Sequence, residues 1–183
     1  MTKDEIREYM KIRRRNLTQE FIDSASLSIE GAAISKIQDK NTVMVYISAF
    51  KEPDTYGIID KLRNLGIRIA VPVSDTDTCT ITPSVLTSVH DMQKGAYGIY
   101  EPRIVIPISP EEIDAVLIPG VAFGISGERL GFGKGYYDRF LAEFHGLKIG
   151  ICYDFQVMDN LPVDKHDVKM DLIITEKGIY NDF

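Results

Sequence analysis

The chain has 183 residues and carries 21 Lys and Arg against 27 Asp and Glu, which gives a net charge of −6. Its length favours one compact domain, and 44% hydrophobic with 26% charged residues argues against a fibrous or disordered chain. The acidic balance argues against nucleic-acid binding, which needs a dense cationic face. No stretch approaches the roughly 18 apolar residues of a membrane span, and the N-terminal MTKDEIREYMK is charged where a signal peptide would be apolar. We therefore expect a cytoplasmic monomer that contacts neither nucleic acid nor membrane.

The first two segments and the one that follows them have contrasting patterns. Apolar periodicity predicts helices over 2–16 and 19–38, with Thr18 as the N-cap of the second. The run VMVYISAF at 43–50 is almost continuously apolar and rich in β-branched and aromatic residues, which is typical of a strand covered on both faces. Helical periodicity returns over 54–65 and a strand follows over 67–72, so these segments predict a right-handed βαβ unit.

The second half of the chain extends the same sheet. Residues 74–109 hold short apolar segments broken by Asp, Gly and Pro, which predicts extended strands or loops rather than helices. Buried strands are predicted over 115–119, 148–153 and 171–175, and a helix over 135–144. No repeat or linker divides the chain, so we expect a single α/β domain over 1–183, with helices on both faces of a mainly parallel open sheet.

Cysteine and histidine offer little chemistry. Cys79 and Cys152 each lie in an apolar run without a nearby Cys or His, and we expect both to be buried thiols. His90, His145 and His166 are scattered, which argues against a His-rich metal site.

The segment GERLGFGKGYYDRFL at 127–141 is the strongest candidate site. Gly131, Gly133 and Gly135 alternate around Lys134 before a predicted helix, so backbone amides can approach a phosphate closely. Neither standard fingerprint is present, because GxGxxG would need glycine at Tyr136 and a Walker A motif would need Ser or Thr at position 135. The alternative is a solvated surface turn. The concentration of polar and aromatic residues at the carboxyl end of a strand favours a phosphate site; these are Arg129, Lys134, Tyr136, Tyr137, Asp138 and Arg139.

Charged residues elsewhere add to this site. Residues 1–15 hold six Lys and Arg against three Asp and Glu, a net +3, so an anion is expected near the N-terminus, where Lys3, Arg7 and Lys11 form a stripe. A solvated helix face is the alternative for this stripe. Asp138 could cap its helix or hold a divalent cation. A second acidic cluster either brings a carboxylate to the same end of the sheet or forms a solvated loop; its members are Asp164, His166, Asp167 and Asp171.

Together these segments resemble the ATP-dependent 5-formyltetrahydrofolate cyclo-ligase family, also called 5,10-methenyltetrahydrofolate synthetases. The resemblance covers nearly the whole chain, through KxxxR at 3–7, YISAFKEPDT, YGIYEP, PGVAFGISGERLGFGKGYYDRFL and LPVDKHDVKMDLIITE. The stretch RLGFGKGYYDR is its most specific part. The chain departs from the family at Gly124, where Asp usually follows the Phe of PGxxF. The resemblance implies a Rossmann-like fold of the NagB/RpiA/CoA-transferase type.

The resemblance also implies residue roles. ATP would contact Lys3, Asp4, Glu5, Ile6, Arg7, Arg129, Leu130, Gly131, Phe132, Gly133, Lys134, Gly135, Tyr136 and Tyr137. The folate, with or without a polyglutamate tail, would contact Ile47, Glu52, Phe132, Gly133, Lys134, Gly135 and Tyr136. Mg²⁺ would be bound by Asp138 and Asp167, and the catalytic residues would be Lys3, Arg7, Glu52 and Lys134.

The implied reaction is ATP- and Mg²⁺-dependent conversion of 5-formyltetrahydrofolate to 5,10-methenyltetrahydrofolate, with release of ADP and phosphate through an iminium phosphate. No step needs a protein nucleophile, which agrees with the lack of a convincing Ser/His/Asp or Cys/His arrangement. Two other readings stay open from the residues alone. They are a sugar-phosphate isomerase that grips its substrate with the glycine loop, and a non-catalytic nucleotide-binding or RNA-associated protein.

Overall fold

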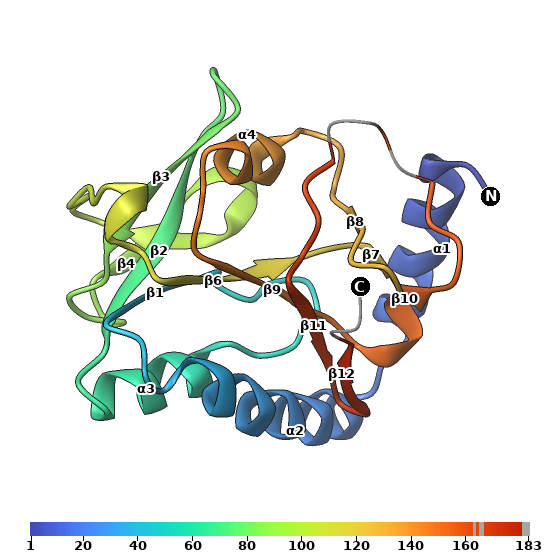
Figure 1. Ribbon diagram of the computed structural model, residues 1–183, viewed down its shortest axis with the longest axis horizontal. Helices are drawn as coiled ribbons and strands as arrows, with labels where there is room; N and C mark the ends of the chain where they lie inside the picture. The colour runs from blue at the N-terminus through green and yellow to red at the C-terminus, as the bar shows by residue number, and fades with distance from the viewer. Residues whose placement is uncertain (163, 165–166, 181–183) are drawn as a thin grey trace.

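The computed structural model describes residues 1–162, 164 and 167–180. A seven-stranded sheet with the order β12-β11-β9-β6-β1-β2-β3 forms its centre (Figure 1). The strands are β1 Thr42–Val45, β2 Arg68–Asp75, β3 Thr80–Val85, β6 Ala115–Pro119, β9 Leu147–Ile151, β11 Leu172–Thr175 and β12 Gly178–Tyr180. The inner strands pair in parallel, and the edge strands β3 and β12 are antiparallel to their neighbours. The predicted α/β class and mainly parallel sheet are confirmed.

Helices cover both faces of this sheet. Helices α2 Gln19–Ile37 and α3 Tyr56–Asn64 pack on one face, while α4 Tyr136–Ala142 lies on the other (Figure 1). Helix α1 Lys3–Arg15 lies at one end, beside a small sheet of β10 Val157–Met158, β7 Ala122–Gly124 and β8 Arg129–Leu130. No helix in the described ranges is long and apolar enough to cross a membrane.

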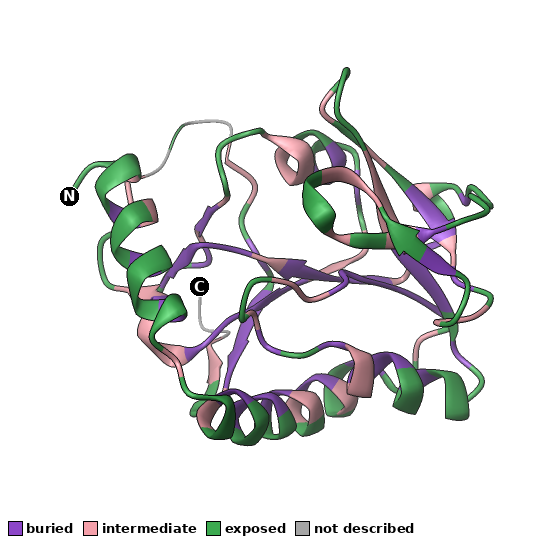
Figure 2. Ribbon diagram, turned by 180° about the vertical axis from the view of Figure 1, so that it is seen from behind, coloured by how far each residue is buried: buried purple, intermediate pink, exposed green. Residues whose placement is uncertain are grey.

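The core explains why these segments fold as they do. Helix α2 buries Ile22, Ala25, Ile29 and Ala33, spaced by three and four residues, against the apolar strands (Figure 2). The predicted N-cap at Thr18 is confirmed, because its side chain accepts a hydrogen bond from the Phe21 amide at 3.2 Å. A separate apolar cluster seats α1, where Ile6 and Met10 pack against Val121, Ala122 and Leu130.

The first strand is shorter than the predicted 43–50. Strand β1 ends at Val45, and Phe50 and Lys51 have φ angles of 51° and 60°, so the chain turns before Glu52. The Glu52 amide donates to the Ala49 carbonyl oxygen at 3.0 Å and closes this turn. Tyr46 and Ile47 are still buried, which explains why the apolar run extended the prediction.

The segment 74–109 is extended, as predicted. It contains β3 and a separate hairpin of β4 Met92–Lys94 and β5 Tyr100–Pro102, joined through the 3₁₀ turn η1 Ala96–Gly98. Two more 3₁₀ turns follow later, η2 Pro110–Glu112 and η3 Asp154–Gln156. The expectation of two buried thiols is right for Cys152 and wrong for Cys79, which lies partly exposed in the β2–β3 turn with a φ of 54°. Its apolar run begins at that turn, so the run gives no information about burial of its first residue.

Candidate active site

A cavity of about 580 Å³ lies where β1 and β6 end. At these neighbouring strands the chain connections switch from one face of the sheet to the other, because α3 follows β1 on one face and α4 follows β6 on the other (Figure 1). Open α/β sheets bind ligands at such switch points. The cavity wall combines residues after β1, the β4–β5 turn and the glycine loop; these include Ile47, Glu52, Tyr97, Tyr100, Arg129, Phe132, Lys134, Gly135, Tyr136 and Asp138.

The glycine loop is held by α1. The Nε atom of Arg7 donates to the Gly131 carbonyl oxygen at 3.1 Å, and a Cβ atom at Gly133 would lie 3.4 Å from the Arg7 guanidinium carbon. Gly133 and Gly135 have φ angles of 98° and 74°, a conformation that strains other residues. Arg7, for which the resemblance implies a nucleotide contact, therefore lies against this loop.

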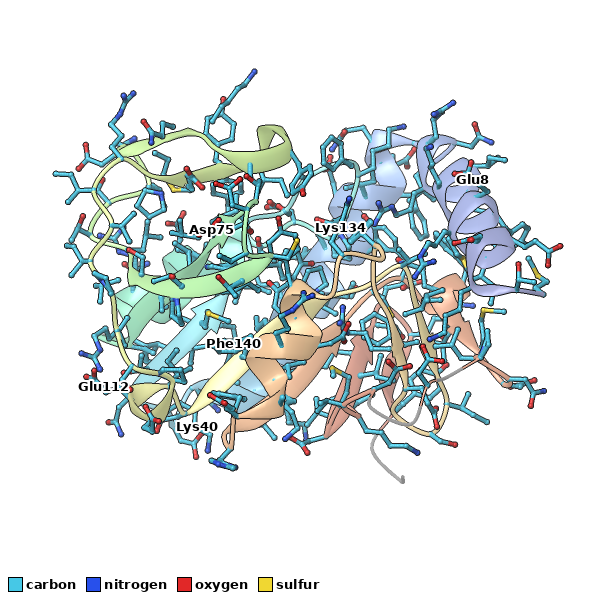
Figure 3. All side chains as sticks on the ribbon, turned by 90° about the horizontal axis from the view of Figure 1, so that it is seen from above. Glu8, Lys40, Asp75, Glu112, Lys134 and Phe140 are labelled. Carbon is cyan, nitrogen blue, oxygen red and sulfur yellow. The ribbon has the colours of Figure 1, made fainter. Side chains whose placement is uncertain are left out.

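Lys134 lies on the exposed part of the loop. In Figure 3 it lies between α1, marked by Glu8, and the end of β2, marked by Asp75. Within the described part of the chain its ammonium group has no ion-pair partner, whereas neighbouring Arg139 donates to the Lys134 carbonyl oxygen at 2.9 Å. Lys134 thus adds uncompensated positive charge to the cavity wall, which suits an anionic ligand.

Lys3, at the start of α1, pairs with Asp164 and Asp167 of the predicted acidic cluster. The Lys3 ammonium lies 2.7 Å from an Asp164 oxygen and 3.2 Å from an Asp167 oxygen, and the hydrogen bond to Asp164 raises the pKa of Lys3. Asp4 accepts from Arg7 at 2.6 Å, and Glu5 completes a capping box with Thr2.

The buried neighbours of these polar residues have a packing role. Among the other predicted nucleotide contacts, the side chains of Ile6 and Leu130 are buried in the apolar cluster under α1. Any contact of these two residues with a nucleotide is therefore through the backbone.

The predicted acidic cluster is split. Asp171 directly precedes β11 and pairs with Lys148 at 3.0 Å, at the amino end of the parallel strands and away from the cavity. Of the two alternatives left open for this cluster, Asp171 does not bring a carboxylate to the site, because it lies at the opposite end of the sheet. His166 lies outside the described residues.

Arg129 and Asp138 form a further ion pair at the cavity. The Arg129 side chain is 4% exposed, and its NH2 atom lies 2.6 Å from an Asp138 oxygen. Its guanidinium also lies 5.5 Å from the centre of the Tyr137 ring. The carboxylate therefore compensates a buried charge while 40% of its own side chain stays exposed at the cavity.

The predicted magnesium ligands make no metal centre by themselves. Asp138 pairs with Arg129 and Asp167 with Lys3, and the described ranges contain no group of three or more potential ligands. Mg²⁺ commonly binds through one or two carboxylates together with substrate phosphates. The donor set therefore fits Mg²⁺ if a nucleotide supplies phosphate oxygens.

Glu52 and Ile47 line the same cavity as the glycine loop. The Glu52 carboxylate accepts a hydrogen bond from the Ala49 amide at 3.0 Å and lies 3.5 Å from the Arg14 guanidinium. Burial raises the pKa of Glu52, and the charge of Arg14 and the Ala49 amide oppose that rise. Each predicted folate contact except Gly133 lies in the wall of this one cavity.

Sequence reasoning gave no role to two parts of the site. Tyr97, in the YGIYEP stretch, faces Tyr136 with the two hydroxyl oxygens 3.1 Å apart and their rings edge to face. Arg14 counted only toward the charge of the first segment, although it contacts Glu52. Neither pairing has a signal in local periodicity, because each joins residues far apart in the chain.

Gly124, where the chain departs from the family pattern, lies against the Glu128 side chain. It lies buried in β7, and a Cβ atom there would collide with the Glu128 carboxylate, which pairs with Lys169 at 2.9 Å. An Asp at this position would need Glu128 to move.

Comparison with known proteins gives a consistent result. The model of the 5-formyltetrahydrofolate cyclo-ligase family matches residues 1–176. An NMR structure of 5,10-methenyltetrahydrofolate synthetase from Aquifex aeolicus is 33% identical, with a TM-score of 0.87, and covers 99% of this chain and 93% of that one. The 5,10-methenyltetrahydrofolate synthetase from Mycoplasma pneumoniae is 27% identical, with a TM-score of 0.81, covering 96% and 99%. A 5-formyltetrahydrofolate cyclo-ligase from Saccharomyces cerevisiae is 32% identical over 209 residues, covering 97% and 96%. The prediction of a ligase of this kind is confirmed, and the chain belongs to the 5-formyltetrahydrofolate cyclo-ligase family.

Proposed function

We propose that this protein uses ATP and Mg²⁺ to convert 5-formyltetrahydrofolate to 5,10-methenyltetrahydrofolate, ADP and phosphate. The observation that carries the proposal is that Glu52 and the glycine loop line the same cavity. A phosphoryl transfer from ATP to the formyl oxygen requires both substrates in one enclosure, with the reacting atoms in line.

The nucleotide side is formed by α1 and the glycine loop. Lys3, Arg7 and Lys134 supply positive charge for the phosphates, and the loop amides between 131 and 135 supply hydrogen-bond donors. Lys3 exchanges part of its contact with Asp164 and Asp167 for a phosphate oxygen. Charge stabilisation of this kind is the main catalytic contribution expected for phosphoryl transfer.

Asp138 and Asp167 would hold Mg²⁺ together with the nucleotide phosphates, and the bound ion would neutralise charge on the phosphates. Asp138 is suited to this role because its carboxylate is exposed at the cavity although it pairs with Arg129.

The folate side uses a carboxylate and apolar walls. Glu52 accepts hydrogen bonds from N–H groups of the folate, while Ile47 and Phe132 contact its ring system. These contacts fix the formyl group toward the γ-phosphate, and the aromatic residues Tyr97 and Tyr136 exclude water from the cavity.

The chemistry follows from this placement. The formyl oxygen attacks the γ-phosphorus, the bond to the ADP oxygen breaks, and an iminium phosphate forms at N5. N10 then bonds to the former formyl carbon, loses its proton, and the C–O bond to phosphate breaks to leave the methenyl bridge. The chain needs to orient the reactants and stabilise charge, but it needs no nucleophile of its own.

The experiment is a spectrophotometric assay of the purified chain with 5-formyltetrahydrofolate, followed at the methenyltetrahydrofolate absorbance band. An increase that requires both ATP and Mg²⁺ is the expected result, with EDTA as the metal control. No increase from folded protein would contradict the proposal. Isomerisation of sugar phosphates without ATP would instead favour the isomerase reading.

A further inference from the structure

The Glu52 carboxylate is supported from behind the cavity wall. Its Oε1 atom lies 3.5 Å from the NH1 atom of Arg14, and each side chain is only 9% exposed. The Arg14 guanidinium also lies 5.6 Å from the centre of the Phe132 ring. Glu52 and Phe132 line the cavity whereas Arg14 does not, so Arg14 contacts two wall residues without reaching the cavity itself.

The loop that carries Glu52 is attached to the same end of α1 at a second point. Lys51 donates from its ammonium group to the carbonyl oxygens of Arg15 and Leu17, at 2.8 and 2.7 Å. Phe50 and Lys51 both have positive φ angles, so this turn depends on outside contacts to keep its shape. Lys51 therefore holds the backbone of this turn, whereas Arg14 interacts with the Glu52 carboxylate.

Arg14 is the positive charge that faces Glu52. Among the described residues, the other titratable groups that interact electrostatically with this carboxylate are the phenols of Tyr46, Tyr137 and Tyr153. These phenols are neutral, since burial raises the pKa of each one. A buried carboxylate without a cation takes up a proton and then presents a donor where an acceptor is needed.

The NH1 atom of Arg14 also retains hydrogen-bonding capacity. It is buried, and within the described part of the chain it has no hydrogen-bond partner at the ion-pair distance of 3.5 Å from Glu52. Charge-assisted hydrogen bonds are shorter, at about 2.7–2.9 Å. The pair is therefore an ion pair in which NH1 donates no hydrogen bond to a described residue, so Arg14 acts on Glu52 through its charge.

We propose that Arg14 is a positioning residue for the folate side of the cavity, which keeps Glu52 ionised and aimed at the N–H groups of the folate. This inference rests on the proposed function. It assigns Arg14 a role in folate binding rather than in nucleotide binding, although Arg14 lies on the helix that carries Lys3 and Arg7.

The test measures two affinities separately, for 5-formyltetrahydrofolate and for a non-hydrolysable ATP analogue. The variants are Arg14→Met, Arg14→Lys, Glu52→Gln and the double variant of Arg14→Met with Glu52→Gln. Arg15→Met is the matched control, because Arg15 is the next residue on the helix, is exposed, and makes no side-chain hydrogen bond or ion pair in the described ranges.

Arg14→Met is expected to weaken folate binding by about 10-fold or more, because the buried Glu52 carboxylate loses the charge that compensates it. Binding of the ATP analogue should be unchanged, Arg14→Lys should recover part of the folate affinity, and Arg15→Met should match wild type. The double variant should bind folate no more weakly than Glu52→Gln, because Arg14 acts through Glu52.

The pH profile of folate binding separates positioning from general loss of structure. The acidic limb should move to higher pH in Arg14→Met and disappear in Glu52→Gln. An unmoved limb, or equal losses of folate and nucleotide affinity in Arg14→Met, would overturn the inference. If wild type forms product while Arg14→Met behaves like Arg15→Met, the inference alone fails. If wild type neither binds the folate nor forms product, the proposed function fails with it.

Discussion

The Nε atom of Arg7 donates to the carbonyl oxygen of Gly131 at 3.1 Å, so the first helix and the glycine loop, 124 residues apart in the chain, are directly joined. Ile6 and Leu130 pack beneath this contact. The shape of the loop therefore depends on α1 as well as on its own glycines, and substitutions on either segment are expected to affect nucleotide binding.

Lys3→Gln is predicted to raise the KM for ATP about 10-fold while the KM for the folate stays near its wild-type value, because in the proposed function the Lys3 ammonium binds the nucleotide and not the folate. Steady-state kinetics with each substrate varied in turn measures the two values. Lys36→Gln is the control, since it removes an exposed lysine from α2. Equal increases in both KM values would argue against the assignment.

Asp138→Asn is predicted to lower turnover and to raise the Mg²⁺ concentration needed for half-maximal rate. The variant keeps an oxygen near Arg129 but removes the negative charge that compensates a side chain only 4% exposed. Some loss of stability should accompany the kinetic effect, since a buried charge loses its partner. Turnover at limiting Mg²⁺ equal to that of wild type would show that Asp138 does not bind the metal.

Gly133→Ala is predicted to weaken ATP binding in addition to lowering the free energy of unfolding. Its φ of 98° strains any other residue, and the added Cβ atom would lie 3.4 Å from the Arg7 guanidinium. Gly66→Ala is the matched control, because Gly66 has a φ of 78° and open space around its Cβ position. Each substitution should cost about 1–2 kcal/mol in unfolding free energy, but only Gly133→Ala should lose nucleotide affinity, as measured by calorimetry. Equal nucleotide affinity in both variants would contradict this role of the loop.

Arg14→Met is predicted to be destabilised more at high pH than at low pH. Burial already raises the pKa of Glu52 in the folded state above its pKa in the unfolded state. Ionisation of Glu52 therefore lowers the free energy of unfolding as pH rises from the unfolded-state pKa through the folded-state pKa. Without Arg14 that pKa rises further, and the stability difference from wild type should increase as pH rises above the unfolded-state pKa of Glu, about 4.3. Urea unfolding at several pH values measures this difference. A difference independent of pH would mean that Arg14 contributes packing rather than charge compensation.

Local hydrophobic patterns in the sequence predicted most of the central helices and strands. The three- and four-residue spacing in α2 and the β-branched runs of the inner strands predicted the central elements, because each depends on one face or on continuous burial. The glycine loop could also be predicted, since alternating glycines around Lys134 are a local signal. The resemblance to a family brought Ile47 and Glu52 to notice, and both line the cavity.

Only the tertiary structure decided which charges meet. Arg14 with Glu52, Lys3 with Asp167 and Arg129 with Asp138 are pairs whose partners lie on different elements. Their formation depends on where β1 ends, how the 46–52 segment turns, and how α1 seats on the small sheet. The exposure of Cys79 has the same origin, because the hairpin places it in a turn. Sequence periodicity reports which face of an element is apolar, but the distance between two charged side chains is set by the packing of whole elements.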